Sequence, residues 1–318
     1  MAHRTVDISI HGTWHTVPAM EFESEVIAIT GTWLKMAVIH DDEYLEREFQ
    51  NPERCVKQLK QRRSEGLRAD IFTFTQRSPE AAARFSYPVE WESLAIVRTT
   101  SFKTWWENLP QEGRKNVRRA EKRGVIVTVK QLDQDLVHDI RDLNNDSPVR
   151  QGRAFVHYGK TLEQVEKDQA AFGGRSDYVC AYLGTELIGF LKIVYRGDIA
   201  SLVQILPKAS HHDKRPANAL LAKAVELCEA KRMSYLTYGL FNYGNRGDSS
   251  LRQFKIRNGF EELRIPRFYV PLTAWGKLCT TLKLYRGLIG ILPERVTRVG
   301  VTARAKWYEL LYFVRKPV

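Results

Sequence analysis

Cationic side chains are concentrated in one short segment near the middle of the chain, where they could hold an anion. The stretch "RKNVRRAEKRG", residues 114–124, contains six lysines or arginines and one glutamate. Drawn as a helix, it places the cations on one half of its surface, with Val117 and Ala120 opposite. We predict that Arg118 and Lys122, one helical turn apart, line an approach for the anionic part of a substrate. The alternative is a solvated face on a packed helix.

A second candidate for anion binding is the start of a predicted helix after residue 215. Apolar residues at helical spacing indicate this helix: Leu220, Leu221, Ala224, Val225 and Cys228. Pro216 suits its first turn, and the polar loop before it ends in Lys214 and Arg215. The free backbone N–H groups and partial positive charge of a helix start favour phosphate, and the two cations add to this. An ordinary exposed helix start would give the same pattern.

Hydroxyl and amide side chains occur where the next strand is predicted to end. The stretch "MSYLTYGLF", residues 233–241, is typical of a strand and leads into the loop "NYGNRGD". Tyr238 lies near the end of the strand, and Asn242 and Tyr243 begin the loop. These side chains could assist proton transfer or hold a substrate, and they could equally be the ordinary lining of a pocket.

The composition narrows the class of protein without choosing a substrate. The chain has 318 residues, of which 43% are hydrophobic, enough for a sizeable core and for about two domains. Its formal net charge of +12 would attract nucleic acid, a nucleotide cofactor or an anionic membrane. No segment approaches the roughly 18 apolar residues of a spanning helix, and the first residues lack a signal-peptide core. We therefore expect a cytoplasmic protein.

The commonest metal-binding and catalytic motifs are absent from the sequence. Its four cysteines are scattered without CxxC spacing, which favours neither a zinc site nor a disulfide framework. The eight histidines include no HExxH, and there is no GxGxxG, GxxxxGKS/T or GxSxG. We therefore expect no metal, and we set aside the dinucleotide-binding, P-loop and serine-hydrolase interpretations.

The predicted elements form two successive mixed α/β units. The first contains a charged helix over 52–66 and four strands: 25–30, 34–40, 70–76 and 93–100. In the second, the basic helix and the strand "VIVTV" precede helices over 136–144 and 162–171. Residues 177–206 are typical of a three-stranded antiparallel meander with tight turns. The helix after Arg215 and the strand 233–241 follow, and the unit ends with a helix capped by Asp248 or Ser249 and a strand over 261–270.

This order of elements resembles the GNAT superfamily, and within it the FemAB-like branch of peptidoglycan aminoacyltransferases and related predicted acetyltransferases. The segment 114–124 is similar to the branch's "R.nIRrAeK.G" signature, and "LRQFKIRNGF", residues 251–260, to its "l..FK..FG" segment. The resemblance covers residues 105–273 and implies a GNAT acyltransferase domain with a mixed α/β sheet. It further implies that residues 1–104 are a divergent GNAT-like half, which leaves 274–318 as a C-terminal extension.

The resemblance implies direct attack of an amine on a thioester or ester carbonyl, with no covalent enzyme intermediate. It places Lys255 at the reacting centre as a charge stabiliser and Phe254 in the pocket wall. From the residues alone, Phe254 is expected in the core and Lys255 on the surface. The GNAT loop Gln/Arg-x-x-Gly-x-Gly/Ala, which holds the coenzyme A pyrophosphate, falls on His212, Arg215 and Ala217. Only Ala217 fits, although Arg215 could meet phosphate through its side chain.

Three functions stay open at this point. An acyl-coenzyme A-dependent N-acyltransferase, with acetyl-CoA as one donor and a small-molecule or peptide amine as acceptor, is favoured. An aminoacyl-tRNA-dependent ligase is less favoured, because the long helical arm of the tRNA-using members has no counterpart here. The match at Phe254 and Lys255 favours either enzyme over a non-catalytic nucleic-acid-binding module.

The C-terminal extension carries apolar residues near helical spacing, with basic residues among them. The apolar set is Leu278, Leu282, Tyr285, Leu288 and Ile289, and the basic set is Lys277, Lys283 and Arg286. We predict that the extension packs on the catalytic unit, and the alternative is adsorption to an anionic membrane. The oligomeric state cannot be predicted from these patterns.

Overall fold

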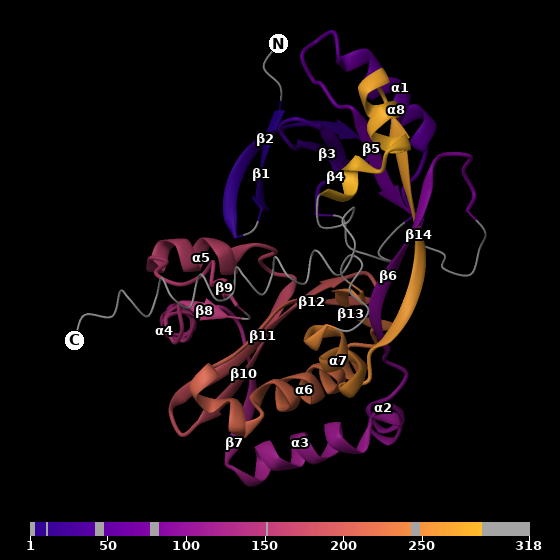
Figure 1. Cartoon of the computed structure of the whole chain (residues 1–318). Coiled ribbons are helices and arrows are strands. Elements are labelled where there is room, and N and C mark those ends of the chain that lie inside the picture. Colours follow the sequence, from indigo (N-terminus) through magenta and orange to yellow (C-terminus); the bar gives the residue numbers. More distant parts are fainter. Residues whose placement is uncertain are drawn as a thin grey trace. The chain divides into compact units, whose positions relative to one another are not determined.

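The chain divides into two compact units that share two long strands. The computed structural model describes residues 4–10, 12–41, 48–76, 83–150, 152–242 and 249–287. Within these ranges, unit 1 comprises the residues up to 94 together with 263–287, and unit 2 comprises residues 95–262. Strands β6 (Val89–Arg98) and β14 (Glu261–Pro271) therefore contribute to both units (Figure 1). These boundaries differ from the expected domain limits at 104 and 273, and the division into two GNAT-like halves stays a prediction.

Unit 1 is built on an antiparallel meander followed by a parallel strand. Besides its parts of β6 and β14, its strands are β1 (Arg4–Ile10), β2 (Thr13–Phe22), β3 (Glu25–Thr30), β4 (Met36–Ile39) and β5 (Ile71–Thr75). β1 to β4 pair antiparallel in chain order, β4 pairs parallel with β5, and β5 pairs antiparallel with β14. Sequence analysis missed β1 and β2, although Val6, Ile8 and Ile10 alternate with polar residues in β1 and the end of β2 is buried.

Helices cover both faces of β5, whose five residues are all buried. Neighbouring residues of a strand point to opposite faces. Phe72 and Phe74 lie in a phenylalanine-containing hydrophobic core with residues of helix α1 (Pro52–Arg62). Ile71 instead contacts the cluster that contains Cys279 of helix α8 (Ala274–Thr281). The described part of the C-terminal extension, which continues into the short helix η2 (Leu284–Arg286), therefore belongs to unit 1, and its packing on the catalytic unit stays a prediction.

Unit 2 contains the predicted meander and a parallel strand beside it. The sheet order is β6-β13-β12-β11-β10-β7, where the further strands are β7 (Val125–Lys130), β10 (Ser176–Leu183), β11 (Glu186–Arg196), β12 (Ile199–Pro207) and β13 (Tyr235–Leu240). β10, β11 and β12 pair antiparallel, and their two turns contain Gly184 and Gly197 with positive φ angles of 61° and 55°. β12 pairs parallel with β13, and α6 (Pro216–Ala230) connects the two. The meander, its turns and this helix are confirmed.

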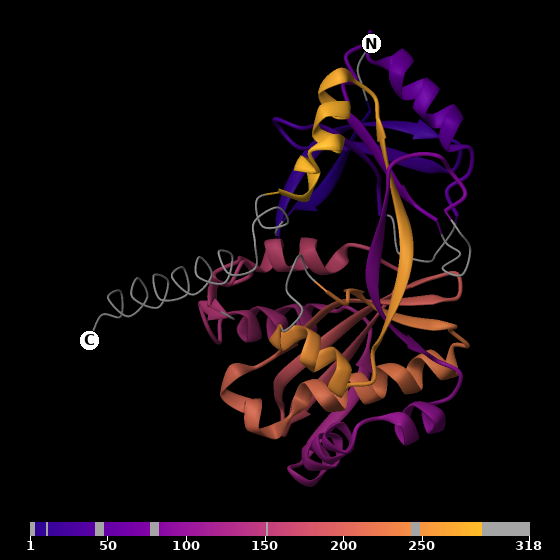
Figure 2. The ribbon, with the colours of Figure 1, turned by 45° about the vertical axis from the view of Figure 1, so that its right-hand side comes forward.

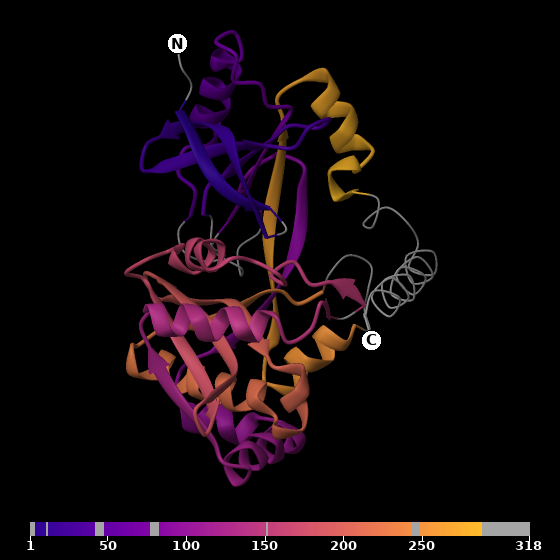
Figure 3. The same cartoon turned by 90° about the vertical axis from the view of Figure 1, so that its left-hand side faces the viewer.

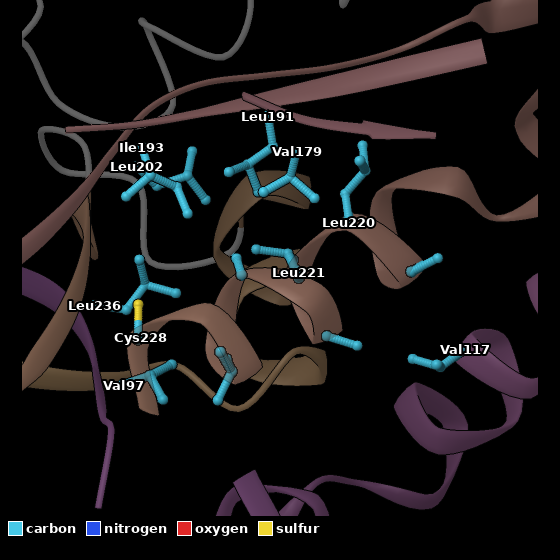
Figure 4. Close-up of a cluster of buried hydrophobic side chains, with 14 of the residues drawn as sticks. Val97, Val117, Val179, Leu191, Ile193, Leu202, Leu220, Leu221, Cys228 and Leu236 are labelled. Carbon is cyan, nitrogen blue, oxygen red and sulfur yellow. The ribbon is translucent and has the colours of Figure 1, made fainter. Parts of the chain in front are cut away.

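Helices pack on both faces of the unit 2 sheet, which gives three layers (Figure 2). One face packs against α6, together with α2 (Phe102–Asn108) and α3 (Gln111–Lys122). The other face packs against α4 (Gln134–Asn144) and α5 (Leu162–Ala170). Neighbouring residues of a strand point to opposite faces of the sheet and so pack against different helices. Val179 and Leu191 pack in the cluster with α6, whereas Tyr178 and Phe190 pack in the cluster with α4 and α5. Figure 4 shows the α6 side chains between the sheet and Val117 of α3.

The remaining described elements are short. They are the strands β8 (Val149–Arg150) and β9 (Arg153–Ala154), the short helix η1 (Ala209–Lys214) and the helix α7 (Ser250–Arg257). Ser249 caps α7, because its side chain accepts a hydrogen bond from the Arg252 N–H, whereas Asp248 lies outside the described residues. Leu288, Ile289 and the rest of the extension also lie outside them. Within the described ranges, no helix is both long and apolar enough to cross a bilayer.

Candidate functional site

The two parallel strands of unit 2 pair only at their beginnings. β12 and β13 pair from Ile199 and Tyr235 to Ser201 and Thr237, three residues on each strand. Both strands continue, β12 to Pro207 and β13 to Leu240, and no further pairs join them along these described residues. Backbone N–H and C=O groups at a strand end that lacks a partner strand can bind an extended ligand or a polar side chain. The strand ends beyond Ser201 and Thr237 are therefore a candidate site.

Lys255 of α7 occupies the end of β13. Its Nζ donates hydrogen bonds to the backbone oxygens of Tyr238 and Leu240, at 2.7 and 2.6 Å, and lies 4.4 Å from the centroid of the Tyr238 ring. The side chain is fully buried, whereas its neighbour Phe254 is only half-buried and packs beside the hydrophobic core. The residue-based expectation of a surface lysine was wrong, because the carbonyl groups at the strand end satisfy a buried ammonium.

Burial lowers the pKa of Lys255 from its ordinary value of 10.5 to about 8. A second lysine has the same environment in a different part of unit 2. Lys192 of β11 is 2% exposed, and its Nζ donates to the backbone oxygens of Gln169 and Ala171 at 2.6 and 2.8 Å. Burial lowers its pKa to about 8 as well. Sequence reasoning missed Lys192, although a single lysine inside the apolar strand "LIGFLKIVY" was a usable signal.

The low pKa of Lys255 predicts a measurable dependence of stability on pH. Between pH 8 and 10.5 the folded protein has released the Lys255 proton while the unfolded chain still holds it, so the wild type gains stability as the pH rises. Lys255→Met lacks this gain. Urea unfolding measures the unfolding free energy of the wild type and of Lys255→Met. The wild-type value minus the variant value should rise by up to about 3 kcal/mol between pH 8 and pH 10.5.

Other titrating groups do not obscure this comparison. Burial raises the pKa of the Cys228 thiol to about 12 and also raises the pKa of Tyr178, and both groups are present in wild type and variant. Their contributions cancel in the difference. A difference in unfolding free energy that stays constant with pH would show that Lys255 is not ionised differently in the folded and unfolded chains.

The start of α6 brings three cations together. Arg215 precedes the helix with φ 59° and ψ 40°, a left-handed conformation that glycine adopts more easily than arginine. The Nε of Arg215 is buried and, in the described structure, has no hydrogen-bond partner. Lys214 and Arg123 both bind the carboxylate of Asp213, at 3.0 and 2.6 Å, and the hydrogen bond from Lys214 contributes most to lowering the pKa of Asp213. The N–H of Ala217, in the first turn, meets no acceptor among the described residues.

Two buried asparagines join the start of α6 to the end of α7. Asn218 Nδ2 donates to Asn258 Oδ1 at 2.8 Å, and Asn258 Nδ2 donates to the backbone oxygen of Phe254 at 2.7 Å. The indole of Trp105 donates to the backbone oxygen of Asn258 at 3.3 Å. The candidate phosphate site at Arg215 and the helix that carries Lys255 are therefore held in a fixed relation. Sequence reasoning missed this pair, because nothing in the sequence relates two asparagines that are 40 residues apart.

The basic helix α3 uses half of its cations for structure. Arg114 donates to the backbone oxygens of Trp106, Glu107 and Leu109 and so caps the end of α2. Arg118 lies over the Trp106 ring at 5.6 Å, and Arg123 binds Asp213. The other three cations are exposed and form no ion pair with described residues: Lys115, Arg119 and Lys122. Arg118 and Lys122 are thus exposed on α3, and their proposed part in guiding an anion stays a prediction.

The polar side chains around the end of β13 are only partly described. Tyr238 is half-buried, and its ring packs against Phe260 at 5.8 Å between centroids. Asn242 is half-buried in the bend that follows Phe241. Tyr243 lies outside the described residues. The structure therefore places Tyr238 beside Lys255, whereas Asn242 follows the end of β13 by two residues, and the chemical roles of both stay predictions.

One surface cavity of about 510 Å³ lies away from these residues. It is formed between the end of α4 and the start of α5, and its lining consists of Arg141, Asn145, Gly159, Lys160, Thr161, Leu162 and Glu163. None of these residues was predicted to belong to a site. No group of three or more metal-binding side chains occurs among the residues that the structure describes.

Comparison with known proteins gives a fold but no sequence relative. No family model matches the sequence, and no curated protein matches it. Among solved structures, the chain is similar to FemX, with a TM-score of 0.56, 10% identity, and 88% of this chain and 90% of that chain covered. The chain has a FemAB-like GNAT fold. The predicted fold class is confirmed.

Two further solved structures share this fold. They are L-PGS from Bacillus licheniformis, with a TM-score of 0.56 and 14% identity over 86% of this chain and 89% of that chain, and a putative lysylphosphatidylglycerol synthetase C-terminal domain from Agrobacterium fabrum. The latter has a TM-score of 0.55 and 16% identity over 83% and 87% of the two chains. These coverages exceed the length of unit 2, so the likeness includes parts of both units.

Proposed function

We propose that this protein is an N-acyltransferase that moves an acyl group from acyl-coenzyme A to an amine. The observation that supports this most is the buried ammonium of Lys255 beside the strand ends where β12 and β13 stop pairing. A positive charge fixed in a dry environment is what an acyl transfer requires, because negative charge develops on the carbonyl oxygen during attack. The acceptor is a small-molecule or peptide amine.

The start of α6 suits the phosphates of coenzyme A. The GNAT resemblance aligns Arg215 with a glycine of the phosphate loop, and Arg215 has the left-handed backbone that such a glycine would have. The left-handed backbone of Arg215 supports a loop of similar shape in place of the missing motif. The buried Nε of Arg215, the N–H of Ala217 and the ammonium of Lys214 are donors of the kind that hold phosphate at a helix start. The amides of the pantetheine arm could pair with the strand ends beyond Ser201 and Thr237.

Coenzyme A, when bound, supplies the acyl group as a thioester. In the proposed reaction the amine nitrogen forms a bond to the carbonyl carbon, the carbon–sulfur bond breaks, and its electron pair leaves with sulfur. The amine loses one proton, which the sulfur gains, and we assign Tyr238 or Tyr243 to carry it. Lys255 stabilises the carbonyl oxygen by its charge, with up to about 4 kcal/mol at about 4 Å for an effective dielectric constant of about 20.

An aminoacyl-tRNA donor is the second candidate. It is supported by the exposed cations Lys115, Arg119 and Lys122 on α3, which form no ion pairs with described residues and suit a polyphosphate backbone. The two donors make different demands. A coenzyme A site requires one pyrophosphate position at α6, whereas tRNA would require many distributed contacts whose affinity falls steeply with salt.

Ligand analysis of the native protein tests the donor class. We expect native mass spectrometry to find coenzyme A or its thioester retained by the protein, and calorimetric titration with acetyl-CoA to give one site. Retained tRNA, with no coenzyme A binding, would overturn the donor assignment and leave the transferase assignment standing. Tight, salt-sensitive binding of duplex nucleic acid without either donor would support a non-catalytic nucleic-acid-binding protein instead.

A further inference from the structure

The outer side of α8 in unit 1 is apolar and exposed. Leu278, Leu282 and Trp275 are 47%, 55% and 43% exposed, at spacings of three and four residues that place them on one side of the helix. Trp33, 60% exposed in the segment before β4, lies beside them, since its ring is 6.3 Å from that of Trp275. These four residues form one surface, which we call the tryptophan–leucine surface. In Figure 3, α8 lies at the periphery of unit 1.

The opposite side of α8 is firmly attached to unit 1, so the tryptophan–leucine surface is held rigidly outward. Cys279 is fully buried, and Gly276 lies so close to the backbone of Asp70 that a Cβ atom would come within 1.9 Å of its oxygen. Thr273 caps the helix and donates to the Asp70 carboxylate at 3.0 Å. The indole of Trp275 donates to the backbone oxygen of Trp33 at 3.2 Å, which fixes the two rings.

The exposed charged side chains on the segments that carry this surface are basic, and the acidic groups nearby, Asp70 and Glu90, are bound to Thr273 and Arg286. No aspartate or glutamate occurs between residues 26 and 40 or between residues 271 and 289, the segments that carry the four apolar residues. Arg286 is paired with Glu90 at 2.6 Å, whereas Lys277 and Lys283 are exposed and have no ion pair in the described part of the chain. Tryptophan and leucine with lysines beside them are the composition of surfaces that insert into the boundary of an anionic bilayer.

We propose that the tryptophan–leucine surface docks unit 1 on anionic phospholipid membranes. The two indoles and the leucines enter the headgroup boundary, and Lys277 and Lys283 bind lipid phosphates. A second copy of the chain fits less well, because a symmetric contact would bring the same lysines of both copies together. The inference rests on unit 1 alone and does not depend on the proposed acyl transfer.

Vesicle flotation with the full-length protein tests this proposal. We expect binding to vesicles of phosphatidylcholine with phosphatidylglycerol and little binding to phosphatidylcholine alone. Lys277→Glu with Lys283→Glu should weaken binding to the anionic vesicles about tenfold or more. Trp275→Ser with Leu278→Ser should weaken it by a similar factor, because the inserted apolar area is lost. Circular dichroism and unchanged melting temperatures should show that these variants fold.

Trp91→Ser provides the matched control. Trp91 is 49% exposed on β6, and its neighbour Glu90 contacts Arg286, so the Trp91 side chain points to the opposite face of the strand. Its loss should leave vesicle binding unchanged. The proposal is overturned by absence of binding to anionic vesicles, by equal loss in the Trp91 variant, or by a dimer in analytical ultracentrifugation that Trp275→Ser with Leu278→Ser dissociates.

Discussion

Lys255→Met is expected to lower kcat about 10²-fold or more while changing KM little, once a donor and an acceptor have been found. Loss of one group that stabilises the developing negative charge typically has an effect of this size, and it acts on the transition state and not on substrate binding. Lys255→Arg should restore only part of the activity, since a guanidinium is broader and cannot meet both the Tyr238 and Leu240 oxygens in the same way.

The pH profile distinguishes this role from a structural one. Stabilisation of negative charge requires the protonated lysine, and burial lowers the pKa of Lys255 to about 8, so wild-type kcat should fall as the pH rises through about 8. The residual kcat of Lys255→Met should not fall in this way as the pH rises through about 8. If Lys255 only held the end of β13, its replacement would lower the stability of the protein, but kcat of the wild type would not fall as the pH rises through about 8.

Lys192→Met is the matched control for Lys255→Met. Lys192 is equally buried, bonds two backbone oxygens and has a pKa lowered to about 8, but it belongs to β11 and holds residues at the end of α5. Both variants lose one buried ammonium and leave two carbonyl groups without a donor, at a cost of about 1–3 kcal/mol for each group. We expect comparable destabilisation but a large loss of kcat only for Lys255. Equal losses of kcat would remove Lys255 from the mechanism.

The elements were predictable wherever periodicity and turn chemistry agreed. The meander β10–β12 is apolar along each strand and interrupted by glycines at its turns, and α6 carries leucines at helical spacing, so their positions followed from the sequence. Gly259, with φ 78°, follows α7 and is a signal of the same kind for the end of a helix. β1 and β2 were missed although Val6, Ile8 and Ile10 alternate with polar residues in β1, a pattern typical of a half-buried strand.

The candidate site was less predictable, because backbone groups and distant side chains create it. The buried ammonium of Lys255 is stabilised by two backbone carbonyl oxygens at a strand end. Every residue type has a backbone carbonyl group, so the sequence does not indicate these acceptors. The contact of Asn218 with Asn258 and that of Trp33 with Trp275 join segments far apart in the sequence. The basic helix looked like one anion-binding surface, yet Arg114 caps α2 and Arg123 neutralises Asp213. Composition alone cannot separate such structural cations from free ones.

Arg215→Glu is expected to weaken acyl-coenzyme A binding roughly 10- to 100-fold with little change in melting temperature. The lost charge-assisted hydrogen bonds to phosphate are each worth about 1.5–3 kcal/mol, and the new carboxylate repels the ligand. Arg232→Glu is the matched control, because Arg232 has the same left-handed backbone, with φ 56°, at the opposite end of α6. Its replacement should leave donor binding unchanged. Calorimetric titration of each variant with acetyl-CoA measures the effect.

Arg215→Gly separates the side chain from the loop shape. Glycine keeps the left-handed backbone and removes the strain that arginine bears with φ 59°, so this variant should be as stable as the wild type or more stable by roughly 0.5–1 kcal/mol. If the guanidinium binds phosphate, affinity for acetyl-CoA should still fall, by less than in Arg215→Glu because no repulsion is added. If only the loop shape and the N–H of Ala217 matter, Arg215→Gly should bind as well as the wild type. Unchanged affinity in both Arg215 variants would show that the donor phosphates are not bound at the start of α6.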